Sequence, residues 1–286
     1  MDKLYAPRTI NDIMKKHDFK TSKRYGQNFL TDGNIVRKIV DAAATTKDDL
    51  IIEIGPGIGT LTAELAKEAG KVLAIEIDKR LIPILNENLK EFENIRIMNI
   101  DFLLADIEKI IKEEKPIGDV KIIGNLPYYI TTPIIMKILE EKIKVKSITI
   151  MVQKEVADRL KAHPGTKEYG AISVAVQYYA DIKMISQVSR EVFLPKPHVD
   201  SAVIRLDIRK KPAVEVENEE LFFQLVKAGF NQRRKTLLNA LSQLSSFNKV
   251  ALEKTLIKCE IDPKRRAETL SLEEFALLER ALSQGF

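Results

Sequence analysis

Three glycines between an apolar strand pattern and a helical pattern constrain the fold of this chain more than any other feature. Residues 50–54 form a short apolar run, glycines occupy positions 55, 57 and 59, and residues 60–68 carry apolar side chains at helical spacing. A strand, a tight glycine turn and a helix open a βαβ unit, which builds parallel sheets. The alternation continues with predicted strands over 71–77, 95–100, 120–124 and 147–153, and predicted helices over 34–44, 81–89, 133–140 and 154–162. The sequence therefore predicts an α/β fold with a doubly wound, mostly parallel sheet.

The ends of the chain depart from this alternation. Residues 1–31 show no clear period and predict an extended, partly helical arm. The segments 171–179, 183–188 and 202–208 are rich in β-branched and aromatic residues, which predicts strands and an antiparallel hairpin at one sheet edge. After a change of composition at 210–217, helical periodicity appears over 221–230, 234–244, 249–258 and 272–282. We expect an α/β domain over 1–211 and a small α-helical domain over 212–286.

Composition excludes several classes of protein. With 45% hydrophobic and 30% charged residues among 286, the chain has an ordinary globular composition. No stretch approaches the roughly 18 consecutive apolar residues of a membrane helix, and residues 1–30 lack the apolar core of a secretory signal. The single cysteine, Cys259, excludes an internal disulfide, and no metal-ligand cluster is apparent. We expect a cytoplasmic protein, monomeric, without a metal and without membrane association.

Positive charge gathers in two places. The net charge is +5, and residues 1–30 hold seven basic against three acidic side chains, Lys23 and Arg24 among them. Arg233, Arg234 and Lys235 stand together in the predicted helical domain. Both groups suggest contact with nucleic-acid phosphates, although charge runs are usually solvated faces.

Two acidic residues follow the glycine turn at the ends of neighbouring strands. Glu76 comes 21 residues after Gly55, and Asp101 ends the third strand. Because the carboxyl ends of parallel strands share one crevice, we expect Gly55, Glu76 and Asp101 to converge there, where acidic side chains accept hydrogen bonds from ribose hydroxyls. A nucleotide-dependent oxidoreductase would use the same crevice, but Thr60 stands where its motif requires the last glycine. The spacing is instead similar to that of S-adenosylmethionine-dependent methyltransferases, whose cationic sulfonium suits an acidic pocket.

A turn of sequence Asn125-Leu126-Pro127-Tyr128 follows the fourth strand at the same edge of the sheet. One interpretation is a proline turn with a buried tyrosine. The other is catalytic, because an exocyclic amine on a base is a poor nucleophile until acceptors draw its nitrogen towards tetrahedral geometry. The Asn125 side-chain oxygen and the Leu126 carbonyl would accept the two amine protons, and Tyr128 would stack on the ring. Such a site acts by positioning and preorganised electrostatics, without a strong general base.

Together these motifs resemble the ribosomal RNA adenine-N6 dimethyltransferase family, most closely its small-subunit branch, over nearly the whole chain. The matching segments are Lys23–Leu30, Glu53–Gly59, Glu76, Asp101, Asn125–Tyr128 and Val192–Val203. The resemblance implies a Rossmann-like S-adenosylmethionine-dependent methyltransferase fold. It also implies that Asn28 and Leu30 touch the cofactor, beside Gly55, Glu76, Asp101 and Asn125.

The resemblance also implies how the substrate is held. Phe193 would sandwich a flipped adenine opposite Tyr128, and paired aromatic rings suit a base taken out of its stack. The segment 230–238 is similar to the small-subunit branch, so Arg233, Arg234 and Lys235 would contact phosphate, as would Lys23 and Arg24 at the cofactor mouth.

The implied activity is dimethylation of two adjacent adenosines near the 3′ end of 16S rRNA in the small ribosomal subunit, a step of ribosome biogenesis. Two alternatives stay open at this point. One is a large-subunit rRNA dimethyltransferase of the macrolide-resistance type, and the other is an assembly factor whose binding role dominates.

Overall fold

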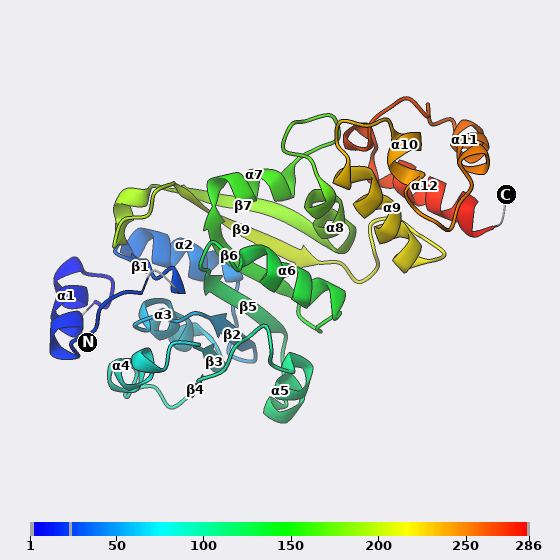
Figure 1. Ribbon diagram of the computed structural model, residues 1–286. Coiled ribbons are helices and arrows are strands. Elements are labelled where there is room, and N and C mark those ends of the chain that lie inside the picture. The colour runs from blue at the N-terminus through cyan, green and yellow to red at the C-terminus, as the bar shows by residue number, and fades with distance from the viewer. Residues whose placement is uncertain (1–2, 23–24, 285–286) are drawn as a thin grey trace. The chain divides into compact units, whose positions relative to one another are not determined.

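The structure, a computed structural model, describes residues 3–22 and 25–284. Within these residues the strands form a seven-stranded sheet of order β4-β3-β2-β5-β6-β9-β7 (Figure 1) and a two-stranded ribbon of β1 (Phe29–Leu30) with β8 (Phe193–Leu194). The sheet strands are β2 (Leu50–Ile54), β3 (Lys71–Ile75), β4 (Ile95–Met98), β5 (Val120–Asn125), β6 (Ser147–Gln153), β7 (Ala180–Val188) and β9 (Ser201–Ile208). Strands β2 to β6 pair in parallel, and β9 pairs with β6 in the antiparallel sense. The predicted fold class, a mostly parallel sheet with antiparallel pairing towards one edge, is confirmed.

Helices lie before, between and after the parallel strands, and all but α5 coincide with a predicted helix. They are α2 (Gly33–Ala43), α3 (Thr60–Glu68), α4 (Ile82–Asn88), α5 (Ile107–Glu114), α6 (Thr131–Glu140) and α7 (Lys154–Lys161). Ile39 of α2 and Leu65 of α3 pack with Ile51 of β2 in one buried cluster, which explains why the central strands are continuous apolar runs. Helix α5 is missing from the sequence prediction, and it is short, with only Ile107 and Ile111 buried.

The amino-terminal arm contains a helix, α1 (Pro7–Lys16), whose buried Ile10 packs with Phe19, Phe29 and Leu85. Beyond it, β1 (Phe29–Leu30) pairs in the antiparallel sense with β8 (Phe193–Leu194). The arm is therefore folded onto the α/β unit through its own core and its own strand pair.

One predicted strand is wrong, because residues 171–179 form helix α8 (Ala171–Tyr179). The Ser173 hydroxyl accepts a hydrogen bond from the Gly170 N–H at 3.0 Å and donates one to the Arg159 carbonyl at 2.6 Å, which fixes the start of the helix. Val174 and Tyr178, one turn apart, are then buried together in a helical core. Capping and packing override the strand preference of the β-branched residues here.

The described chain divides into two compact units, one of residues 1–157 with 182–208 and the other of 158–181 with 209–286. The second unit contains α8, α9 (Glu219–Asn231), α10 (Leu237–Leu241), α11 (Lys249–Lys258) and α12 (Leu272–Ser283). Its core includes Tyr178 stacked on Phe222, with ring centroids 5.0 Å apart. The composition shift predicts a single boundary at residue 211, whereas in the structure segment 158–181 joins the helical unit through the side chains of α8.

Candidate active site

A cavity of about 210 Å³ opens in the first unit where β2, β3 and β5 end. Its walls come from the arm (25–30), the glycine turn (53–58), the ends of neighbouring strands (75–77 and 100–103) and the turn after β5 (125–130). Every predicted cofactor residue lines this cavity: Asn28, Leu30, Gly55, Glu76, Asp101 and Asn125. The convergence expected at the carboxyl ends of the strands is observed.

The glycine turn brings backbone atoms to the cavity wall. Gly57 has φ of +61°, a conformation that favours glycine, and a Cβ there would lie 3.1 Å from the Phe29 ring. Its N–H donates to Glu76 Oε2 at 3.3 Å. The absence of a side chain at position 57 thus lets the arm, the turn and the acidic residue meet.

Two buried carboxyl groups line the cavity side by side. Burial raises the pKa of Glu76 to about 7, although its Oε1 accepts the Asp78 N–H at 2.8 Å. Burial and the neighbouring Glu76 raise the pKa of Glu53 to about 8, and Glu53 Oε2 has no hydrogen-bond partner among the described residues. Two destabilised carboxylates in one cavity favour a ligand that brings positive charge and hydrogen-bond donors.

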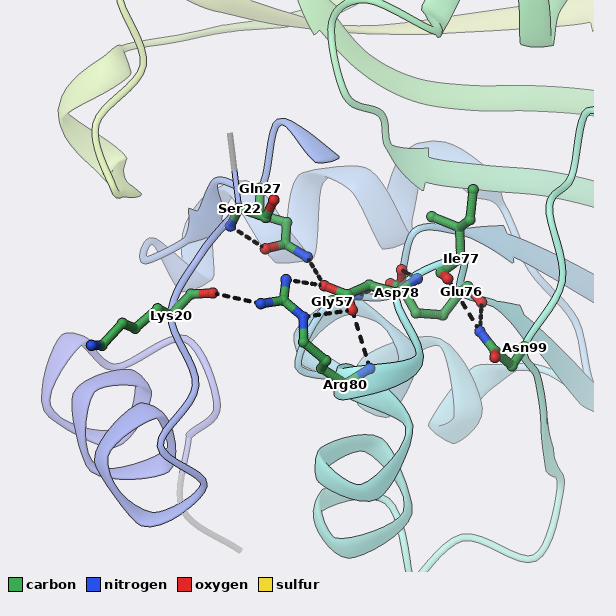
Figure 2. A network of polar contacts seen from close by, with 9 residues as sticks. All are labelled: Lys20, Ser22, Gln27, Gly57, Glu76, Ile77, Asp78, Arg80 and Asn99. Carbon is green, nitrogen blue, oxygen red and sulfur yellow. Dashed lines mark hydrogen bonds and ion pairs between the residues drawn. The ribbon is translucent and has the colours of Figure 1, made fainter. Parts of the chain in front are cut away.

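A polar network fixes the arm beside these carboxylates (Figure 2). The Gln27 amide donates to Asp78 Oδ2 at 2.8 Å, and its oxygen accepts the Ser22 N–H at 2.8 Å. Arg80 donates to both oxygens of the same buried Asp78, at 2.9 and 2.6 Å, and the pKa of Asp78 is lowered, its burial being outweighed by these donors. Asp78 therefore joins the arm to the loop that follows β3.

The Asn125–Tyr128 turn forms a further part of the cavity wall, next to the arm. The Asn125 amide nitrogen donates to the Asn28 carbonyl at 3.0 Å, which orients the side chain. The Pro127 carbonyl accepts the Ile130 N–H at 3.1 Å and the Thr131 hydroxyl at 3.3 Å, so the turn is closed by its own backbone. The half-buried Tyr128 shares a 2.8 Å hydrogen bond with the Ser201 hydroxyl, which is fully buried at the start of β9.

The predicted stacking partner of Tyr128 does not reach the cavity. Phe193 is 5% exposed and packs in the apolar cluster that contains Leu30 and Val36, and it is absent from the cavity lining among the described residues. Its strand β8 faces β1, where Phe193 is the register partner of Leu30. A sandwich of Phe193 and Tyr128 around a base would require this ribbon to rearrange.

The predicted RNA-binding residues divide into three groups. Lys23 and Arg24 lie outside the described residues. Arg233 donates to the carbonyls of Lys167 and Tyr169 at 2.8 and 3.0 Å, so it ties a loop of its own unit together. Arg234 and Lys235 are exposed, and in the described part of the chain no ion pair involves them.

The sequence motifs predict no individual role for Glu53, Gln27 or Ser201. Glu53 and Gln27 line the cavity, and Ser201 lies against its wall through the hydrogen bond to Tyr128. For Glu53 a signal exists, since it is the one charged residue of an otherwise apolar strand. The other two act through partners far along the chain, which no local pattern reveals.

Residues 3–22 and 25–284 contain no group of three or more potential metal ligands. No helix among them has the length and apolar character needed to span a membrane.

Comparisons with known proteins agree with this geometry. The family model described as ribosomal RNA adenine dimethylase matches residues 18–284. The ribosomal RNA small subunit methyltransferase A of Alkaliphilus oremlandii (strain OhILAs) is 54% identical, covering 99% of each chain, and that of Clostridioides difficile (strain 630) is 52% identical, covering 99% of this chain and 98% of its own.

Solved structures show the same fold. A dimethyladenosine transferase from Plasmodium falciparum has a TM-score of 0.74 at 26% identity, covering 87% of this chain and 95% of its own. The 23S rRNA methyltransferase ErmE has a TM-score of 0.68 at 28% identity, covering 90% and 100% respectively.

Proposed function

The chain belongs to the ribosomal RNA adenine dimethylase family and is a small-subunit rRNA adenine dimethyltransferase dependent on S-adenosylmethionine, and we propose that it acts on two adjacent adenosines near the 3′ end of 16S rRNA. One observation carries the site assignment: the Asn125–Tyr128 turn lines the same cavity as Glu76 and Asp101. A methyl donor held by the acidic residues would then face a base held by the turn.

The cavity residues fit S-adenosylmethionine. Glu53 has a buried oxygen without a partner, which suits the positively charged donor, and Glu76 and Asp101 stand where ribose and adenine donors need acceptors. When bound, S-adenosylmethionine supplies an electrophilic methyl group on its sulfonium. Asn28 and Leu30 would close the cavity over it from the arm, beside the glycine turn at Gly55.

The turn would activate the amine of the target adenine. Because the Asn125 nitrogen is occupied by the Asn28 carbonyl, the Asn125 oxygen is the atom available to accept one amine proton. The Leu126 carbonyl would accept the second, with Pro127 fixing the backbone and Tyr128 stacking on the ring. The amine nitrogen loses conjugation and points its lone pair at the methyl group. The proton becomes acidic only after transfer and leaves to solvent, so no general base is required.

The partner is 16S rRNA in the small subunit, and Arg234 and Lys235 would meet its phosphates. We expect the protein to act as a monomer in the cytoplasm, during ribosome biogenesis.

The decisive experiment is methyl transfer from labelled S-adenosylmethionine to separated small and large ribosomal subunits that lack the modification. Nuclease digestion then identifies the labelled base. Dimethyladenosine in the small subunit, at two adjacent positions, is the expected result. Label confined to the large subunit would move the protein to the branch of ErmE, and binding without transfer would favour an assembly role.

A further inference from the structure

A second aromatic residue, Tyr129, follows Tyr128 at the mouth of the cavity and has no role in the mechanism above. Both side chains line the cavity, but Tyr128 is half-buried and bonded to Ser201, whereas Tyr129 is 58% exposed. Every other phenylalanine and tyrosine among the described residues is buried or half-buried. Tyr129 thus presents an exposed aromatic side chain at the lining of the substrate cavity, where a nucleotide next to the target base would meet it.

The ring of Tyr129 is exposed but supported. A Cβ at Gly26 would lie 3.5 Å from Tyr129 Cε1 and 3.7 Å from Cδ1, so the edge of the ring rests against the arm where it has no side chain. The next residue, Gln27, anchors the arm to buried Asp78 through the 2.8 Å bond seen in Figure 2. The arm thus supports one edge of the ring, while the residue as a whole is 58% exposed.

A base taken out of its stack leaves its neighbour without a stacking partner. The neighbour stays one phosphodiester link away, so it lies at the mouth when the target base is inside the cavity. An exposed aromatic ring there replaces the lost stacking, and base–aromatic stacking is tolerant of sequence because every base has a π-face.

We propose that Tyr129 forms a second base subsite, which stacks the nucleotide next to the target adenine. This inference rests on the proposed function. It assigns Tyr128 to the reacting base and Tyr129 to its neighbour, so two consecutive tyrosines hold two consecutive nucleotides. The subsite lowers the cost of extruding the target without touching the reacting amine.

The test measures kcat/KM for small subunits lacking the modification, and separately the Kd for S-adenosylmethionine, for Tyr129→Ala, Tyr129→Leu and Tyr129→Phe. We expect Tyr129→Ala and Tyr129→Leu to lower kcat/KM by ~5- to 150-fold, the range that loss of one base–aromatic stack implies. Tyr129→Phe keeps the ring and should stay within about twofold of the unaltered protein, and all three should bind S-adenosylmethionine normally. Leu104→Ala is the matched control, since Leu104 is 86% exposed and is not part of the cavity lining.

Three results would overturn the subsite. Tyr129→Ala with unchanged kcat/KM would show that the ring is not used. Tyr129→Leu as active as Tyr129→Phe would show that apolar volume suffices and no base stacks there. A loss confined to S-adenosylmethionine binding would make Tyr129 part of the cofactor lid. Failure of the unaltered protein to methylate small subunits would instead overturn the proposed function, and this inference with it.

Discussion

The orientation of a single amide decides what Asn125 offers to a substrate. Its nitrogen donates to the Asn28 carbonyl at 3.0 Å, so its oxygen is the acceptor that remains. Asn125→Ala removes that acceptor, and we expect kcat to fall by about 100- to 1,000-fold, as for the loss of one preorganised polar group in other enzymes. Binding to small subunits, measured by co-sedimentation, should be nearly unchanged. Asn34→Ala, which removes an exposed amide from α2, is the control. If Asn125→Ala lost subunit binding to the same extent as methyl transfer, Asn125 would not act in the transfer step alone.

The buried Glu53 carboxyl predicts how stability depends on pH. Its pKa is about 8 in the fold against 4.5 for an ordinary glutamate, so between these values the folded state holds a proton that the unfolded chain has released. The free energy of unfolding from this group therefore falls as pH rises through that window. Glu53→Gln should flatten the decline and be more stable than the unaltered protein at pH 8.5, in urea unfolding at pH 5 and 8.5. The exposed Glu113→Gln should keep the original slope, and a slope unchanged in Glu53→Gln would refute the assignment.

The same carboxyl groups predict a pH effect on the methyl donor. The pKa values of Glu76 and Glu53, about 7 and about 8, mean that both are largely protonated at pH 6 and ionised at pH 8.5. A cationic ligand binds the ionised form better, so calorimetric affinity for S-adenosylmethionine should rise over this range. S-adenosylhomocysteine lacks the sulfonium charge and should show a smaller rise. Equal pH dependence of the two ligands would argue that the sulfonium does not sense these groups.

At the scale of elements, the hydrogen bond between Gln27 and Asp78 is one of the polar contacts that hold the arm to the cavity. Gln27 bonds Asp78 at 2.8 Å, and the next residues of the arm, Asn28 and Leu30, line the cavity. Gln27→Ala should weaken S-adenosylmethionine binding by ~3- to 10-fold, in line with the net worth of about 1 kcal/mol for one hydrogen bond. Titration calorimetry tests this, with the exposed Gln187→Ala of β7 as the control. An unaltered Kd would mean that the other contacts of the arm, among them its apolar core and the β1–β8 pairing, suffice to position it.

Local pattern predicts the elements of the sheet because each of its strands carries its own signal. The apolar runs of β2 and β6 coincide with the predicted bounds, and the glycine turn and strand-end acids lie where parallel topology puts them. The sequence pattern predicts a strand where helix α8 forms, because the cap of this helix involves Arg159, 14 residues before Ser173. The burial of Phe193 is not predicted for a similar reason, since Phe193 pairs with Leu30, which lies near the other end of the α/β unit in the sequence. Long-range partners are what local periodicity cannot encode.

At the scale of the whole molecule, the two units have different relations to the sequence. The α/β unit follows its own alternating pattern, whereas the helical unit takes in residues 158–181, which lie within the strand-rich part of the chain. Tyr169 and Tyr178 from that segment are fully buried in the helical core. The composition shift at 210–217 marks where the chain enters the second unit for the second time. No comparable shift marks its first entry at residue 158.

The helical unit also carries the charges that should dock the rRNA. Arg234 and Lys235 are exposed, and each phosphate contact contributes about 0.7 to 0.9 to the slope of log affinity against log salt concentration. Replacing both by glutamine should weaken binding to small subunits and reduce that slope by about 1.4 to 1.8, in filter binding over a salt series. Arg233→Gln is the matched contrast, because this arginine donates to the carbonyls of Lys167 and Tyr169. It should lower the stability of the fold by about 1 kcal/mol and leave the slope closer to the original. If the double variant kept the full slope, the phosphate contacts would have to lie elsewhere on the protein.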